Sequence, residues 1–137
     1  MGRVVSYTRV ERAKIGFPRT RLSVDVPIAV SQAARTRGLH GRPAVATTDG
    51  MLFLFETEAP VMTMTGMLTA LDFLFLDRTG KILMLAPDIP PGVPRVTAKG
   101  LPTRYVLELG PGFLRQTGRG TQVGDTLSIW RYHTARS

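Results

Sequence analysis

The sequence contains no cysteine among its 137 residues, which excludes disulfide bonds, thiolate metal ligands and thiol nucleophiles. It has only two histidines, His40 and His133, and no acidic residue stands near either at a spacing typical of a metal site. No serine lies in a Gly-x-Ser-x-Gly motif, so acyl transfer by that route lacks its nucleophile. We therefore expect a protein with no metal, no cofactor and no enzymatic activity.

Long hydrophobic runs are also missing. The longest apolar stretches are interrupted by Asp72 or by proline, and the N-terminal region has no apolar run of signal-peptide length. We expect a chain without a signal peptide that does not interact with membranes and is either cytoplasmic or incorporated into a particle.

The positive charge is unevenly distributed along the chain, whose formal net charge is +8. Residues 1–42 hold nine Lys and Arg against two acids (+7), residues 43–94 hold two against six (−4), and residues 95–137 hold seven against two (+5). Basic ends suit docking onto an acidic surface or nucleic acid, although a solvated surface explains them equally well. The candidate contacts to a partner or polyanion are Arg3, Arg9, Arg12, Lys14, Arg19, Arg21, Arg35 and Arg37.

Strand patterns dominate the chain after residue 21. Residues 22–30 alternate apolar and polar with a period of two, and Pro27 indicates an edge strand or a strand whose outer side is free there. The turn at 77–80 predicts a hairpin between strands 71–77 and 81–86. Further strands are expected at 51–56, 61–67, 104–110 and within 121–132.

Two short helices complete the predicted domain. Ser31 is a suitable N-cap for a helix that ends at Gly38, and a second helix is expected over 111–118. A proline-rich connection covers 87–102. We predict an α+β fold: a compact, mostly antiparallel and barrel-like β domain over 22–132, with a basic extended arm at 1–21 and a tail at 133–137.

Five short motifs occur in the order and approximate spacing of a known bacterial and archaeal family. They lie at 35–42 ("RTRGLHGR"), 50–55 ("GMLFLF"), 71–82 ("LDFLFLDRTGKI"), 104–112 ("RYVLELGPG") and 123–125 ("VGD"). The chain resembles domain-of-unknown-function family 192 over residues 22–130. This resemblance implies a small β-rich fold and no established biochemical activity.

The chain departs from the family pattern in one segment. Where family members usually carry Phe-Trp-Met-Lys-Asn-Thr followed by Pro, it has Met62-Thr63-Met64-Thr65-Gly66-Met67 and then Ala70. Only the methionine at Met64 is kept. A ligand or reaction that needs the Trp, Lys and Asn is therefore not expected here.

Asp72 is part of the pattern that the resemblance implies. We expect this carboxylate to accept hydrogen bonds from backbone N–H groups at a strand start, and the alternative is that it belongs to a pocket. Such a pocket would lie between the proline-rich connection and the strand with Thr63 and Thr65, so its candidate residues are Thr63, Thr65 and Asp72.

Three functions remain open on these observations. We prefer a non-enzymatic structural or interaction module that docks through its basic ends onto protein partners or onto copies of itself, for example as a decoration component of a phage particle. A small-molecule or carbohydrate-binding domain is the second reading. The third is sequence-independent nucleic-acid binding through the N-terminal arginines, with an affinity that falls steeply with salt.

Overall fold

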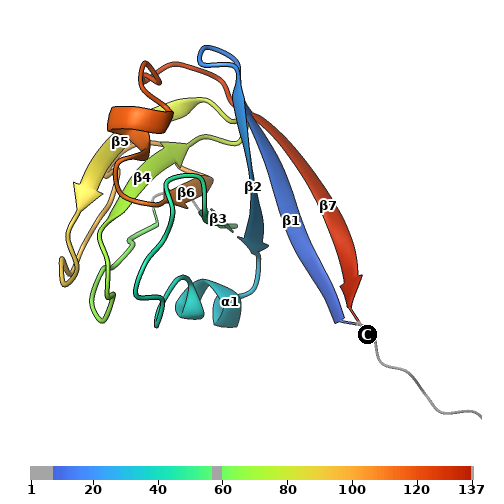
Figure 1. Cartoon of the computed structure of the whole chain (residues 1–137), viewed down its shortest axis with the longest axis vertical. Coiled ribbons are helices and arrows are strands. Elements are labelled where there is room, and N and C mark those ends of the chain that lie inside the picture. The colour runs from blue at the N-terminus through green and yellow to red at the C-terminus, as the bar shows by residue number, and fades with distance from the viewer. Residues whose placement is uncertain (1–7, 57–59, 137) are drawn as a thin grey trace, which may run out of the picture.

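The computed structural model of the chain describes residues 8–56 and 60–136 (Figure 1). Its strands are β1 (Thr8–Phe17), β2 (Leu22–Ala29), β3 (Gly50–Leu54), β4 (Leu71–Leu76), β5 (Ile82–Ile89), β6 (Tyr105–Leu109) and β7 (Ser128–Arg136). The helical elements are α1 (Gln32–Arg37) and a single π-helical turn, η1 (Phe113–Thr117). These elements confirm the predicted α+β class.

All seven strands form one sheet in the order β5-β4-β6-β3-β2-β1-β7. Every pair is antiparallel except β2 with β3, which pair in parallel through Ile28 and Ala29 only. The sheet is curled but not closed into a barrel, because β5 and β7 remain at its two ends. A single bridge between Lys81 and Thr126 links the β4–β5 turn to the segment that precedes β7.

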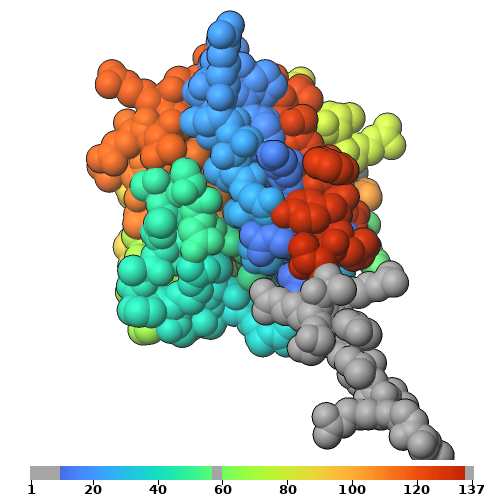
Figure 2. Space-filling view, turned by 45° about the vertical axis from the view of Figure 1, so that its right-hand side comes forward, coloured from blue at the N-terminus to red at the C-terminus, as the bar shows by residue number. Residues whose placement is uncertain are grey.

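The curled sheet encloses one hydrophobic core between its two halves. Ile15 and Val26, from β1 and β2, face Leu52, Leu74 and Leu107 from the other half, and all five are fully buried. A second core lies on the other side of β3, β6 and β4. There α1 and the segments 61–67 and 93–98 cover Phe53, Phe73 and Phe75. The face of β2, β1 and β7 turned away from the first core lies on the molecular surface (Figure 2).

The predicted N-terminal arm belongs largely to this sheet. Residues 8–17 form β1, which lies between β2 and β7, and its side chains Ala13, Ile15 and Phe17 are buried in the first core. The boundary at residue 22 is therefore corrected, because a period of two in these small and apolar residues makes β1 a core strand. Residues 1–7 of the predicted arm lie outside the described residues.

The C-terminal tail is corrected in the same way, since β7 continues through the predicted boundary at residue 133 to Arg136. The outer parts of β1 and β7 do project, as Figure 1 shows. Thr8 to Glu11 pair with β7, whereas the pairing of β1 with β2 begins only at Arg12.

The segment 61–67 is not the strand that its alternation predicted. Only Met62 forms a β-bridge, with Val96. The Thr63 hydroxyl accepts a hydrogen bond from the Thr65 N–H at 3.1 Å, and Gly66 has a positive φ of 79°. This local side-chain hydrogen bond and the left-handed glycine divert the backbone from an extended ladder.

Local signals were read correctly elsewhere. The Ser31 hydroxyl accepts from the Ala34 N–H at 3.0 Å and caps α1, and the hairpin at 77–80 joins β4 to β5. Pro27 does not mark an edge strand, because β2 lies between β1 and β3. It does lie outside the short ladder with β3, as the prediction of a free outer side required.

Candidate functional site

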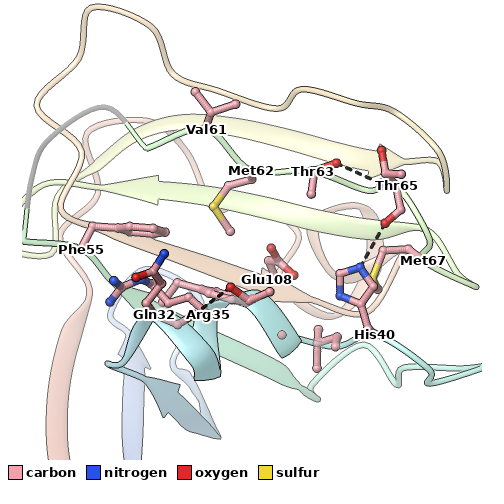
Figure 3. A pocket seen from close by; sticks show the side chains of 14 residues that line it. Gln32, Arg35, His40, Phe55, Val61, Met62, Thr63, Thr65, Met67 and Glu108 are labelled. Atoms are coloured by element: carbon pink, nitrogen blue, oxygen red, sulfur yellow. Dashed lines mark hydrogen bonds between the residues drawn. The ribbon is translucent and has the colours of Figure 1, made fainter.

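A cavity of about 490 Å³ opens between α1 and the segment 61–67, above the second core (Figure 3). Its walls are mainly apolar and come from α1, β3 and the 61–67 segment. The apolar lining residues are Leu39, Phe53, Phe55, Val61, Met62 and Met67. Polar groups at the same cavity are Gln32, Arg35, Thr36, His40, Thr63 and Thr65. A cavity of this size and composition is typical of a site for a small organic molecule.

Among the described residues, Glu108 is the one acidic side chain at this cavity. It belongs to β6, on the face that carries Val106, and it is 5% exposed. Its neighbours across the sheet are Met51 on β3 and Phe73 on β4. The acid is therefore placed among apolar side chains at the sheet surface that forms the floor of the cavity.

The Glu108 carboxyl makes no hydrogen bond and no ion pair with the residues that the structure describes. Burial alone raises its pKa from the ordinary 4.5 to about 8, because the ionised form loses its hydration without gaining a partner. At neutral pH the group is thus mainly the protonated acid, which presents an O–H donor to the cavity.

Arg35 lies at the α1 side of the cavity, and most of its hydrogen bonding is directed at the backbone. One guanidinium nitrogen donates to the carbonyls of Val30 at 2.8 Å and Leu54 at 3.0 Å. Its guanidinium carbon lies 5.3 Å from the centre of the Phe55 ring, a cation–π arrangement. These contacts tie α1 to the residue that precedes it and to the end of β3.

His40 connects α1 to the 61–67 segment. Its Nδ1 lies 2.9 Å from the Arg37 carbonyl and its Nε2 lies 3.0 Å from the Thr65 carbonyl. The ring also packs beside Gly66, where an added Cβ would lie 3.5 Å from it. The imidazole therefore lies between the end of α1 and the 61–67 segment, where a ring N–H can donate to the carbonyl of Arg37 or of Thr65.

Of the three predicted pocket residues, the structure brings Thr63 and Thr65 together at the cavity and leaves Asp72 out. The cavity also adjoins α1, not the proline-rich connection as predicted. Asp72 alternates with Leu71 and Phe73 on β4, so it faces the first core. Its grouping with the two threonines is therefore wrong.

Asp72 has the structural role that we expected of it. The carboxylate is fully buried and accepts two backbone N–H groups, from Asp88 and Leu114, each at 2.8 Å. These charge-assisted bonds tie the end of β5 and the η1 turn to the start of β4. The family motif therefore contains an acid that stabilises the fold.

The candidate polyanion contacts are spread over several elements. Arg12 pairs with Asp25 at 2.8 Å and Arg19 pairs with Asp125 at 2.8 Å, whereas Lys14, Arg21 and Arg37 are exposed. Arg35 lines the cavity. Arg3 lies outside the described residues, and of Arg9 only the backbone, in β1, is described.

Sequence reasoning missed Glu108. The signal was available, because a lone carboxylate inside the apolar run of β6 is the same kind of exception that drew attention to Asp72. The sequence pattern does not predict the cavity on the Glu108 face of β6.

Two solved structures share this fold. A "putative transcription regulator" from Sinorhizobium meliloti 1021 is 32% identical, with 92% of this chain and 97% of that chain covered and a TM-score of 0.76. A protein of unknown function from Novosphingobium aromaticivorans DSM 12444 is 23% identical, with 88% and 85% covered and a TM-score of 0.74. No curated protein matches the chain.

Neither structure supports the particle component that the charge distribution suggested. In the described part of the chain no helix is long and apolar enough to cross a membrane.

The family model DUF192, described as "Uncharacterized ACR", matches residues 15–129. On that match, which spans β1 to β7, the chain belongs to the DUF192 family.

Proposed function

We propose that this protein binds a small organic molecule in the cavity above Glu108, and that binding without chemical conversion is its function. The observation that carries the proposal is the Glu108 carboxyl, which is buried at an open cavity and has no partner among the described residues. A buried polar group without a hydrogen bond is costly, and a ligand that bonds to it recovers part of that cost.

The ligand class follows from the two kinds of surface in the cavity. Phe53, Phe55, Met62 and Met67 favour an apolar body, and methionine side chains adapt to its shape. The protonated Glu108 favours an uncharged oxygen acceptor such as a ketone, ester or amide carbonyl. Such a ligand suits these walls better than a carbohydrate does, because each sugar hydroxyl would need its own polar partner.

The methionines provide a direct test. With ¹³C-methyl methionine labelling, a panel of neutral aryl ketones and amides should shift the methyl signals of Met62 and Met67 in a saturable manner. The methyl of Met84, on β5 and not at the cavity, is the internal control. The same titration is made with Thr63→Val, which changes the cavity wall, and with the exposed Thr48→Val as its matched control.

The pH dependence of binding tests the role of Glu108. A ligand that accepts a hydrogen bond should bind with constant affinity below pH 8 and more weakly above it, because the donor is lost. Glu108→Gln should abolish that pH dependence. If amines bind, and if their affinity increases as the pH rises through 8, the ligand class is an ammonium ion and not a neutral molecule. A panel that leaves the Met62 and Met67 signals unmoved would overturn the proposal.

A further inference from the structure

The two basic ends of the chain meet on one side of the sheet, although they are far apart in the sequence. Strands β1, β2 and β7 contain five Lys and Arg against two acids: Arg9, Arg12, Lys14, Arg131 and Arg136 against Glu11 and Asp25. Strands β3, β4, β5 and β6 contain three acids and no Lys or Arg. The sheet therefore has a basic half and an acidic half, and Figure 2 shows the basic half, β1 and β2 in blue beside β7 in red, at the surface.

An aromatic pair lies on the outer face of this basic half. Trp130 and Tyr132 are next-but-one neighbours on β7, and their ring centroids are 6.0 Å apart. In the antiparallel register Trp130 lies opposite Lys14 and Tyr132 lies opposite Arg12, so all four side chains share one face. Trp130 is 67% exposed, which is unusual for the largest apolar side chain.

Hydrogen bonds hold the Tyr132 side of this pair in place. The Tyr132 hydroxyl donates to Asp25, and Arg12 Nε donates to the same carboxylate at 2.8 Å. Asp25 is thereby neutralised by Arg12, while the cation of Lys14 has no hydrogen bond to another described residue. The face thus combines an ordered ring, an open indole beside it and the exposed ammonium group of Lys14, which lies opposite Asp25 of β2.

We propose that this outer face of β1 and β7 binds single-stranded nucleic acid, with a base stacked on Trp130 and backbone phosphates near Lys14 and Arg12 of the same face. Exposed aromatic rings on a positively charged surface are the combination that binds single strands without reading their sequence. A duplex hides the faces of its bases, so this surface has little to stack on there. The site is separate from the Glu108 cavity: both lie on the face of the sheet turned away from the first core, but Trp130 belongs to β7 at one end of the sheet, and none of Lys14, Trp130 and Tyr132 lines the cavity.

Trp130 is the only tryptophan of the chain, so its fluorescence reports on this surface alone. The probes are a thymidine oligonucleotide of about 12 nucleotides and an abasic oligonucleotide of the same length and charge. The thymidine strand should quench Trp130 and bind at least fivefold more tightly than the abasic strand. Its affinity should fall steeply when salt is raised from about 50 to about 200 mM.

Variants separate stacking from charge. Trp130→Ala should weaken binding of the thymidine strand by about 5- to 100-fold, measured by anisotropy of a labelled strand, and should leave the abasic strand unaffected. The exposed Leu68→Ala, in the segment between β3 and β4, is the matched control and should change neither. Lys14→Gln should weaken both probes equally and reduce the salt slope by about one.

Three results would overturn the proposal. Equal affinity for the thymidine and abasic strands would mean charge attraction only. Equal affinity for a duplex of the same length would remove the role of the exposed base faces. If neither strand binds at low salt, the partner of this face is an acidic protein surface and not a nucleic acid.

Because Trp130 is mostly exposed, its replacement should leave the thermal midpoint unchanged, and that measurement confirms that the variant is folded.

Discussion

Replacing Glu108 with glutamine tests the physical state of the cavity floor without any ligand. The folded protein holds the proton of Glu108 up to a pKa of about 8, whereas the unfolded chain releases it near 4.5. The folded state therefore binds more protons than the unfolded state throughout this interval. Raising the pH from 4.5 to 8 must destabilise the fold, and the loss is complete above pH 8.

The size of this effect follows from the width of the interval. One pKa unit corresponds to about 1.4 kcal/mol, so the Glu108 contribution changes by about 4 kcal/mol between pH 5 and pH 9. The glutamine side chain of the variant has nothing to ionise. We expect Glu108→Gln to be within about 1 kcal/mol of the wild type at pH 5, since an amide resembles the protonated acid in shape, and more stable by several kcal/mol at pH 9.

The assay is urea denaturation of both proteins at pH 5, 7 and 9, with the difference in unfolding free energy taken at each pH. Taking the difference cancels the titration of all other groups. Glu56→Gln, a change of the same kind at an exposed position, should show no such trend. Parallel stability curves for Glu108→Gln and wild type would refute the reasoning, because they would mean that Glu108 is already ionised in the fold.

Other substitutions test the elements that shape the site. Asp72→Asn should cost about 2–3 kcal/mol in unfolding free energy, because an amide cannot accept two backbone N–H groups as a carboxylate does. Gly50→Ala should cost more than about 3 kcal/mol, since its Cβ would lie 1.8 Å from the Glu108 carbonyl oxygen. His40→Ala should cost about 1–2 kcal/mol and speed hydrogen exchange around Thr65, with the exchange of β4 unchanged.

Much of the fold was readable from local signals. The alternation that buries Val24, Val26 and Ile28, the N-cap at Ser31 and the turn at 77–80 each involve residues close in the chain, so the sequence contains their full cause. The carboxylate of Asp72 stood out because an apolar strand surrounds it.

Features that depend on distant segments were not readable in the same way. The short alternation of Ala13, Ile15 and Phe17 is set among charged residues, and it becomes a core strand because β1 lies between β2 and β7, the second of which is more than 110 residues away. The segment 61–67 has a clear period of two, but its threonine hydrogen bond and Gly66 give it another course. Trp130 and Tyr132 form a surface pair because they lie on the face of β7 that is turned away from the first core.

The departure from the family pattern and the state of Glu108 belong to the same place in the molecule. The segment that replaces the family's Phe-Trp-Met-Lys-Asn-Thr lines the cavity, and Thr65 stands where the resemblance implies a lysine. An ammonium group at this wall would favour an ionised acid at the cavity, whereas a threonine hydroxyl supplies no charge. With Thr65 in place, Glu108 keeps its proton at neutral pH and can act as a hydrogen-bond donor. The segment that stands in place of the family's polar cluster thus lines a cavity with mainly apolar walls, in which the buried acid Glu108 can orient what enters.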